Sequence, residues 1–114
     1  MSVQTWGVRI YGVELTPDDM KTPELGELIE EQNLDGLEIA LNEAGGIMPR
    51  FMGFDCDANG RVFLGMYPSY PWYMDDDEPK TEAEAQEKIR AVAAYLVNVV
   101  DSLEFDDFDT YNCG

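Results

Sequence analysis

Histidine is absent from this sequence of 114 residues, and its absence excludes several kinds of site at once. Catalytic triads with an imidazole base and zinc sites with imidazole ligands both need that side chain. Basic residues are also scarce, because seven lysines and arginines stand against 24 aspartates and glutamates. The net charge of −17 repels phosphates, so we expect neither direct nucleic-acid binding nor attachment to an anionic membrane.

Long apolar runs and a disulfide framework are missing as well. No stretch reaches the roughly 18 consecutive apolar residues of a transmembrane helix. The N-terminus lacks the basic start and apolar run of a signal peptide. The two cysteines, Cys56 and Cys113, fit free thiols in a reducing cytoplasm, and a single bridge between them is the alternative. We therefore expect a cytoplasmic protein.

Apolar residues make up 45% of the chain, which is enough to form a packed core and argues against disorder. The length fits one domain. We expect a single compact α+β domain over residues 1–103 and a loose acidic and aromatic tail over residues 104–114.

Alternating apolar residues predict four short strands. These strands are expected at residues 5–15, 37–41, 51–56 and 61–67. The turn at residues 57–60 joins the last two strands into a hairpin, with Gly60 able to take a positive φ. Gly12 suggests a bulge within the first strand.

Two helices are predicted from caps and apolar spacing. Thr22 and Pro23 begin the first, over residues 22–32, and Thr81 with Glu84 forms a capping box for the second, over about residues 82–103. The expected buried positions are Leu25, Leu28, Ile29, Ile89, Val92, Leu96 and Val99. The order β-α-β-β-β-α predicts a two-layer α+β sandwich, in which two helices cover one face of a mostly antiparallel, four-stranded sheet.

Acidic residues gather in clusters with few basic residues among them. On the first predicted helix, Glu24, Glu27, Glu30 and Glu31 lie away from the apolar stripe. Like charges at this spacing cost about 0.2–0.5 kcal/mol per pair, so a helix selected only for stability would contain lysine there. Each cluster alone is explained by solubility. Together they favour an acidic face that imitates the phosphates of a nucleic acid.

Aromatic residues run into the acidic clusters, as in many protein interfaces. Two simpler roles for the rings stay open: the 67–73 loop packs its rings on its own sheet, and Phe105 and Phe108 extend the core contact of the last helix. The candidate partner-binding residues are Glu24, Glu27, Glu30, Glu31, Tyr70, Trp72, Tyr73, Asp75, Asp76, Asp77, Asp106 and Asp107.

One segment matches the opening of a calcium-binding EF-hand loop. Asp55, Asp57 and Asn59 have the required spacing and precede Gly60, but Met66 occupies the position of the bidentate glutamate. The flanks also read as strands, so we expect a plain hairpin turn and no metal. The chain shows no glycine-rich phosphate loop, and its acids lie in polar runs, so we expect no cofactor and no catalysis.

In size, charge and the mixing of acidic with aromatic residues, the chain resembles small acidic inhibitors of nucleic-acid enzymes. These include phage proteins that mimic DNA to block restriction or CRISPR complexes, and immunity proteins that neutralise nuclease toxins. The resemblance carries no individual residue with it. It implies a binding protein that occupies the nucleic-acid groove of a basic partner. The alternative is an acidic housekeeping or self-associating module whose charge reflects solubility or adaptation to salt.

Overall fold

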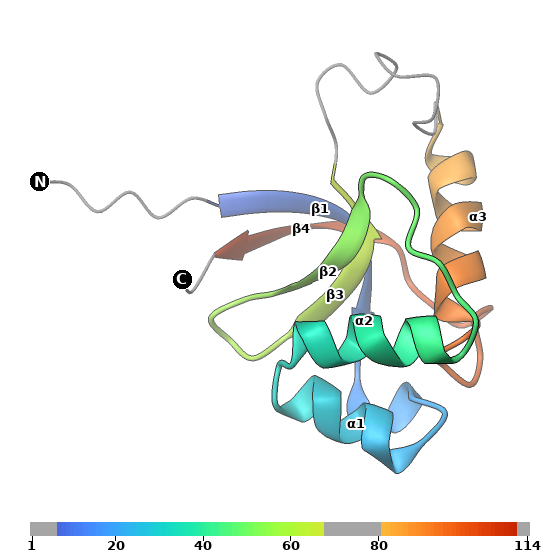
Figure 1. Cartoon of the computed structure of the whole chain (residues 1–114). Coiled ribbons are helices and arrows are strands. Elements are labelled where there is room, and N and C mark those ends of the chain that lie inside the picture. The colour runs from blue at the N-terminus through green and yellow to red at the C-terminus, as the bar shows by residue number, and fades with distance from the viewer. Residues whose placement is uncertain (1–6, 68–80, 112–114) are drawn as a thin grey trace, which may run out of the picture.

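The computed structural model describes residues 7–67 and 81–111 (Figure 1). Its elements are β1 (Gly7–Leu15), the 3-10 turn η1 (Pro17–Asp19), α1 (Pro23–Glu30), α2 (Leu34–Glu43), β2 (Met52–Cys56), β3 (Val62–Met66), α3 (Glu82–Ala93) and β4 (Asp106–Tyr111). The four strands form one sheet in the order β2-β3-β1-β4, and each neighbouring pair is antiparallel. The α+β class and the four-stranded antiparallel sheet are confirmed, and the described residues form three α-helices in place of the expected two.

The strand predicted at residues 37–41 is wrong, because this segment belongs to α2. The side chain of Asn33 caps this helix by accepting a hydrogen bond from the backbone N–H of Gly36 at 3.0 Å. Leu37 and Leu41 are buried and lie four residues apart, whereas Ile39 is 58% exposed. A strand would place all three on one face, but a helix separates Ile39 from the other two.

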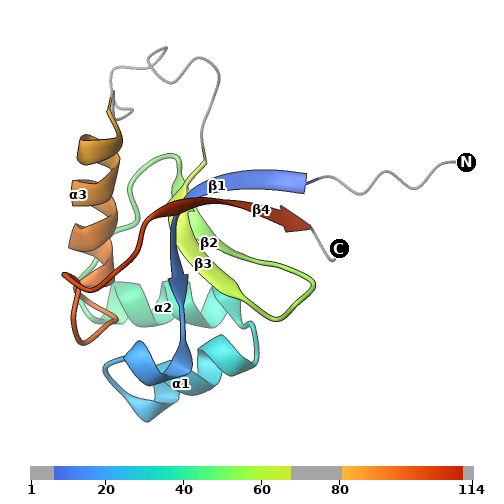
Figure 2. The ribbon, with the colours of Figure 1, turned by 180° about the vertical axis from the view of Figure 1, so that it is seen from behind.

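The segment expected to be a loose tail supplies the fourth strand. β4 pairs with β1 along Gly7–Gly12, and Figure 2 shows the two strands side by side from behind. Phe108 stands opposite Ile10 in this register, and its ring stacks on Phe63 with 4.5 Å between the ring centroids. Ile10 and Phe63 are fully buried on this face of the sheet. A short strand that contains both acidic and aromatic residues therefore completes a small second apolar cluster.

The main core lies between the other face of the sheet and the helices. The expected core residues Leu25, Ile29, Ile89, Val92 and Leu96 are buried, Leu28 is half-buried, and Val99 is 57% exposed. The prediction for Val99 is wrong because α3 ends at Ala93, ten residues earlier than expected. Tertiary contacts end the helix. The chain turns after it, so that the backbone carbonyl of Leu96 accepts a hydrogen bond from the backbone N–H of Lys21 at 2.8 Å, and Val97 forms a β-bridge with Met20.

Gly12 permits a close approach between strands, and no bulge occurs there. The register runs without interruption through Tyr11–Met66, Gly12–Gly65 and Val13–Leu64. A Cβ atom on Gly12 would lie only 2.1 Å from the carbonyl oxygen of Leu64. Because neither Gly12 nor Gly65 has a side chain, β1 can curve here. One half of the strand runs along β4, and the other half descends toward α1 (Figure 1).

Candidate functional site

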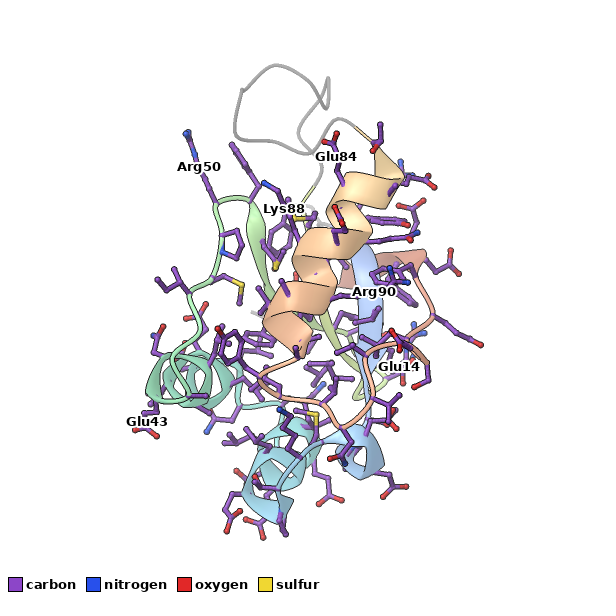
Figure 3. The ribbon with its side chains drawn as sticks, turned by 90° about the vertical axis from the view of Figure 1, so that its right-hand side faces the viewer. Glu14, Glu43, Arg50, Glu84, Lys88 and Arg90 are labelled. Carbon is purple, nitrogen blue, oxygen red and sulfur yellow. The ribbon has the colours of Figure 1, made fainter. Side chains whose placement is uncertain are left out.

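Within residues 7–67 and 81–111, exposed acids are concentrated on η1, α1 and α2, which we call the acidic helical end. Nine exposed carboxylates belong to it: Asp18, Asp19, Glu24, Glu27, Glu30, Glu31, Asp35, Glu38 and Glu43. Within residues 16–44, Lys21 is the one basic residue. None of the nine forms an ion pair with another residue in the described part of the chain. In Figure 3, oxygen-tipped side chains project from both helices, and Glu43 points outward from α2.

Local sequence explains how α1 presents its acids. The hydroxyl of Thr22 accepts a hydrogen bond from the backbone N–H of Leu25 at 3.2 Å, and Pro23 follows at the first helical position. Leu25 and Ile29 face the core, so the four predicted glutamates of α1 are left exposed. This part of the sequence-based prediction agrees with the structure.

Sequence reasoning missed the acids of α2. Asp35, Glu38 and Glu43 join the α1 glutamates only because residues 34–43 are helical. The available signal was the Asn33 cap, followed by leucines at positions 34, 37 and 41. The alternation of Leu37, Ile39 and Leu41 hid that signal.

Three acids of α1 and α2, at the C-terminal ends of these helices, are placed against the helix dipole. Glu30 lies in the last turn of α1 with Glu31 at its C-cap, Glu43 ends α2, and neither last turn contains a basic residue. The C-terminal end of a helix carries partial negative charge, so carboxylates there are unfavourable. α3 has the favourable arrangement, with acids in its first turn and Arg90 in its last. Glu24 and Asp35 lie in the first turns of α1 and α2, where carboxylates are favourable, so the unfavourable placement is limited to the C-terminal ends of these two helices.

A groove separates α1 from α2 at this end. Its volume is about 480 Å³, and its lining residues are Thr22, Glu24, Leu25, Leu28, Gly36, Ile39, Ala40, Glu43 and Ala44. Apolar side chains dominate it, and Glu24 and Glu43 contribute the carboxylates. The acidic surface thus contains an apolar depression.

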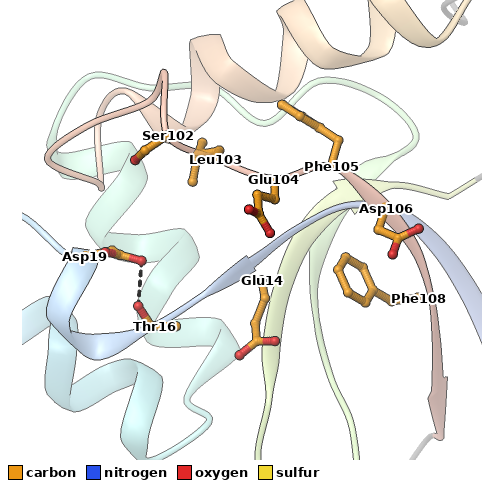
Figure 4. Close-up of a pocket in the computed structure, with 9 residues that line it drawn as sticks. All are labelled: Glu14, Thr16, Asp19, Ser102, Leu103, Glu104, Phe105, Asp106 and Phe108. Carbon is orange, nitrogen blue, oxygen red and sulfur yellow. Dashed lines mark hydrogen bonds between the residues drawn. The ribbon is translucent and has the colours of Figure 1, made fainter.

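A second acidic cavity, of about 450 Å³, lies where β1, η1 and β4 meet (Figure 4). Its lining includes the acids Glu14, Asp19, Glu104 and Asp106, together with Phe108. The hydroxyl of Thr16 donates a hydrogen bond of 2.6 Å to Asp19. Because Asp19 also belongs to the acidic helical end, the two acidic regions adjoin at η1.

Of the two acids predicted on the last segment, only Asp106 lies at this cavity. Successive residues of a strand point to opposite faces, so Asp107 lies on the other side of the sheet. There it accepts a bond of 2.9 Å from Arg9, and both side chains are substantially exposed. The remaining candidates, Tyr70, Trp72, Tyr73, Asp75, Asp76 and Asp77, lie outside the described residues.

The segment that resembles a calcium loop is an ordinary hairpin turn. One oxygen of Asp57 accepts backbone N–H bonds from Asn59 and Arg61, both at 3.0 Å, and the other accepts a bond from the Arg61 guanidinium at 2.7 Å. Burial raises the pKa of Asp57, but these hydrogen bonds outweigh burial and hold the pKa below its usual value. Both oxygens are thus used within the turn. Over residues 7–67 and 81–111, no group of three or more potential ligands is arranged to hold a metal.

β2 and β3 form the expected hairpin. Met52 stands opposite Met66, and Phe54 stands opposite Leu64. Gly60 takes a φ of 87°, a left-handed conformation that favours glycine. Cys56 is half-buried, and Cys113 lies outside the described residues.

Comparisons with known proteins add no functional information. No protein-family model, curated protein or solved structure matches the chain. In the described part of the chain, no helix is both long and apolar enough to cross a membrane.

Proposed function

We propose that this protein is a small acidic binding protein that inhibits a basic nucleic-acid-binding enzyme or complex by occupying its nucleic-acid groove. The placement of the acids on α1 and α2 carries this proposal. Glu30, Glu31 and Glu43 lie at helix ends where stability alone favours lysine or arginine. Selection for a binding surface explains why the protein keeps carboxylates there.

The spacing of these carboxylates suits a phosphate-binding groove. Side chains one helical turn apart stand about 5–6 Å from each other, which is comparable with the spacing of phosphates along a nucleic-acid strand. A basic groove filled by this surface loses its access to substrate and releases the counterions that nucleic acid would displace. The protein then acts by occupancy, as a DNA mimic directed at restriction or CRISPR complexes or at a nuclease toxin does.

The alternative is an acidic coat that serves solubility or salt adaptation, on a housekeeping or self-associating module. A coat of this kind has no reason to place carboxylates at the C-terminal ends of α1 and α2 while α3 has Arg90 in its last turn. The contrast between the helices supports the binding function.

The test begins with capture of partners from the source cells, followed by purification of each captured protein. Association is then measured for the wild type, for the Glu27→Lys/Glu31→Lys double variant, and for a control with the same change in charge, Glu87→Lys/Asp101→Lys. All four positions are exposed, so we expect each variant to keep its fold. Duplex DNA and RNA are added as competitors.

We expect the α1 double variant to bind much more slowly, because charges at an interface act mainly on the association rate. The control should retain most of its binding, and nucleic acid should compete. Rising salt should slow association more than it changes dissociation. Equal binding at low and high salt, together with silent charge reversals on α1, contradicts the proposal and leaves the acids as a coat.

A further inference from the structure

The groove between α1 and α2 contains an apolar side chain that the core does not need. Ile39 is 58% exposed, and it lines the groove together with the half-buried Leu28. Solubility does not explain a large exposed aliphatic group among nine carboxylates. Interfaces commonly place such groups at their centres, where a partner removes them from water.

The walls of the groove decide what shape of partner fits it. Both walls are helices, whose backbone groups are already bonded, so an extended peptide finds no strand edge on which to add. The helices have 8 and 10 residues, or about 12 and 15 Å at 1.5 Å per residue. Residues at the start of α1 line the groove with residues at the end of α2, so the two helices run antiparallel. A third helix of two to three turns suits such a groove.

The charges of the groove decide the composition of that helix. Glu24 and Glu43 contribute carboxylates to its lining, and Glu27, Asp35 and Glu38 lie on the same two helices. None of these five acids is paired within the described part of the chain. A helix that covers Leu28 and Ile39 with apolar residues therefore meets opposite charge when its flanks carry lysine or arginine.

We infer that the α1–α2 groove docks an amphipathic basic helix of the partner, an inference that rests on the proposed function. Many nucleic-acid-binding proteins read the major groove with a basic helix. A helix seated between α1 and α2 is withdrawn from that role. The apolar lining of the groove thus lets the surface select a partner by shape as well as by charge.

The test uses two synthetic peptides of leucine and lysine, each of roughly 14 residues, or about four helical turns. In the first, leucines recur at i, i+3, i+4 and i+7, so they form one face of a helix. In the second, the same residues alternate, so a helix would carry leucine on all sides. Affinities are measured for the wild type, Ile39→Ser and the matched control Ile47→Ser, whose isoleucine is 82% exposed outside the groove.

We expect the first peptide to bind about ten-fold more tightly than the second, and Ile39→Ser to lose about ten-fold in affinity for it. Ile47→Ser should bind like the wild type. Methyl resonances of Leu28 and Ile39 should shift when the first peptide is added. Equal affinity for the two peptides, or equal effects of the two substitutions, overturns the inference.

The outcomes also separate this inference from the proposed function. If charge reversal on α1 weakens the natural partner while Ile39→Ser does not, the groove is no docking site and the proposed function stands. If Ile39→Ser weakens binding but nucleic acid does not compete with the protein for its partner, the groove stands and the proposed function fails.

Discussion

At the scale of single residues, Asp57 has an environment unlike that of the other acids in the described part of the chain. It is 3% exposed, whereas the carboxylates of the acidic helical end are in water. Its two oxygens join Asn59 and Arg61 into the turn between β2 and β3. Asp57 therefore stabilises the fold, whereas the carboxylates of the acidic helical end are exposed to a partner.

Asp57→Asn should destabilise the protein by about 1–3 kcal/mol at neutral pH, because hydrogen bonds to a charged acceptor are lost. The folded-state pKa of Asp57 is lowered, so its contribution is complete above the unfolded value of about 3.9 and disappears as pH falls through the folded value. Urea unfolding from neutral pH to about pH 2 should show the wild type and variant converging. The exposed control Asp101→Asn should change little. A constant difference across this range contradicts the assignment.

The end of α3 gives a second prediction for single residues. Leu96 is 1% exposed and Val99 is 57% exposed, although the apolar stripe of the sequence includes both. Leu96→Ala should cost about 2–5 kcal/mol, and Val99→Ala should stay within about 0.5 kcal/mol. Urea unfolding measures both variants. Comparable losses would place Val99 in the core after all.

At the scale of elements, local signals predicted α1, the start of α3 and the β2–β3 hairpin. Each depends on neighbours in sequence, such as the Thr22 cap or the Gly60 turn. The sequence did not show that residues 34–43 are helical, because apolar residues at 37, 39 and 41 satisfy a strand pattern as well. β4 was missed because its pairing with β1 is a long-range contact. The exposed acids of α1 could therefore be predicted from the sequence. The groove could not, because its prediction requires knowing that both α1 and α2 are helices.

Charge reversal at the C-terminal end of α1 should change the stability of the protein and its affinity for a partner in opposite directions. Glu31→Lys places a lysine four residues after Glu27 and at the negative end of the helix dipole, which should stabilise the protein by about 0.5–1 kcal/mol. The same change should weaken partner binding. On α3, Glu87→Lys loses a favourable spacing to Arg90 and should be slightly destabilising with binding retained. Urea unfolding and binding kinetics on both variants decide the matter, and a stable Glu31→Lys variant that binds normally speaks against a functional surface.

β4 should be needed for the stability of the sheet. Phe108 stacks on the fully buried Phe63, so Phe108→Ala should cost about 1–3 kcal/mol. Amide hydrogen exchange should also be slow where β4 bonds to β1. An unchanged unfolding midpoint, together with fast exchange over residues 106–111, would instead support the prediction of a loose tail.

At the scale of the whole molecule, the net charge of −17 makes the folded state repel itself. Salt shortens the screening length from about 10 Å at 0.1 M to about 3 Å at 1 M. We therefore expect a protein that is folded in dilute buffer and gains stability modestly as salt rises, while its association with a partner slows. Urea unfolding across salt concentrations tests this, and loss of the fold in dilute buffer would instead indicate adaptation to high salt.

The pairing of β1 with β4 also determines the order in which parts of the protein fold during synthesis. Arg9 and Asp107 meet although they are 98 positions apart, so this ladder has the longest loop to close. The α1–α2 pair and the β2–β3 hairpin depend on local contacts and can form while the chain is still being synthesised. The side chains of Ile10 and Phe63 are not covered until Phe108 has left the ribosome. A nascent chain halted before residue 106 therefore exposes the apolar surface that chaperones and proteases recognise, and the last strand conceals it.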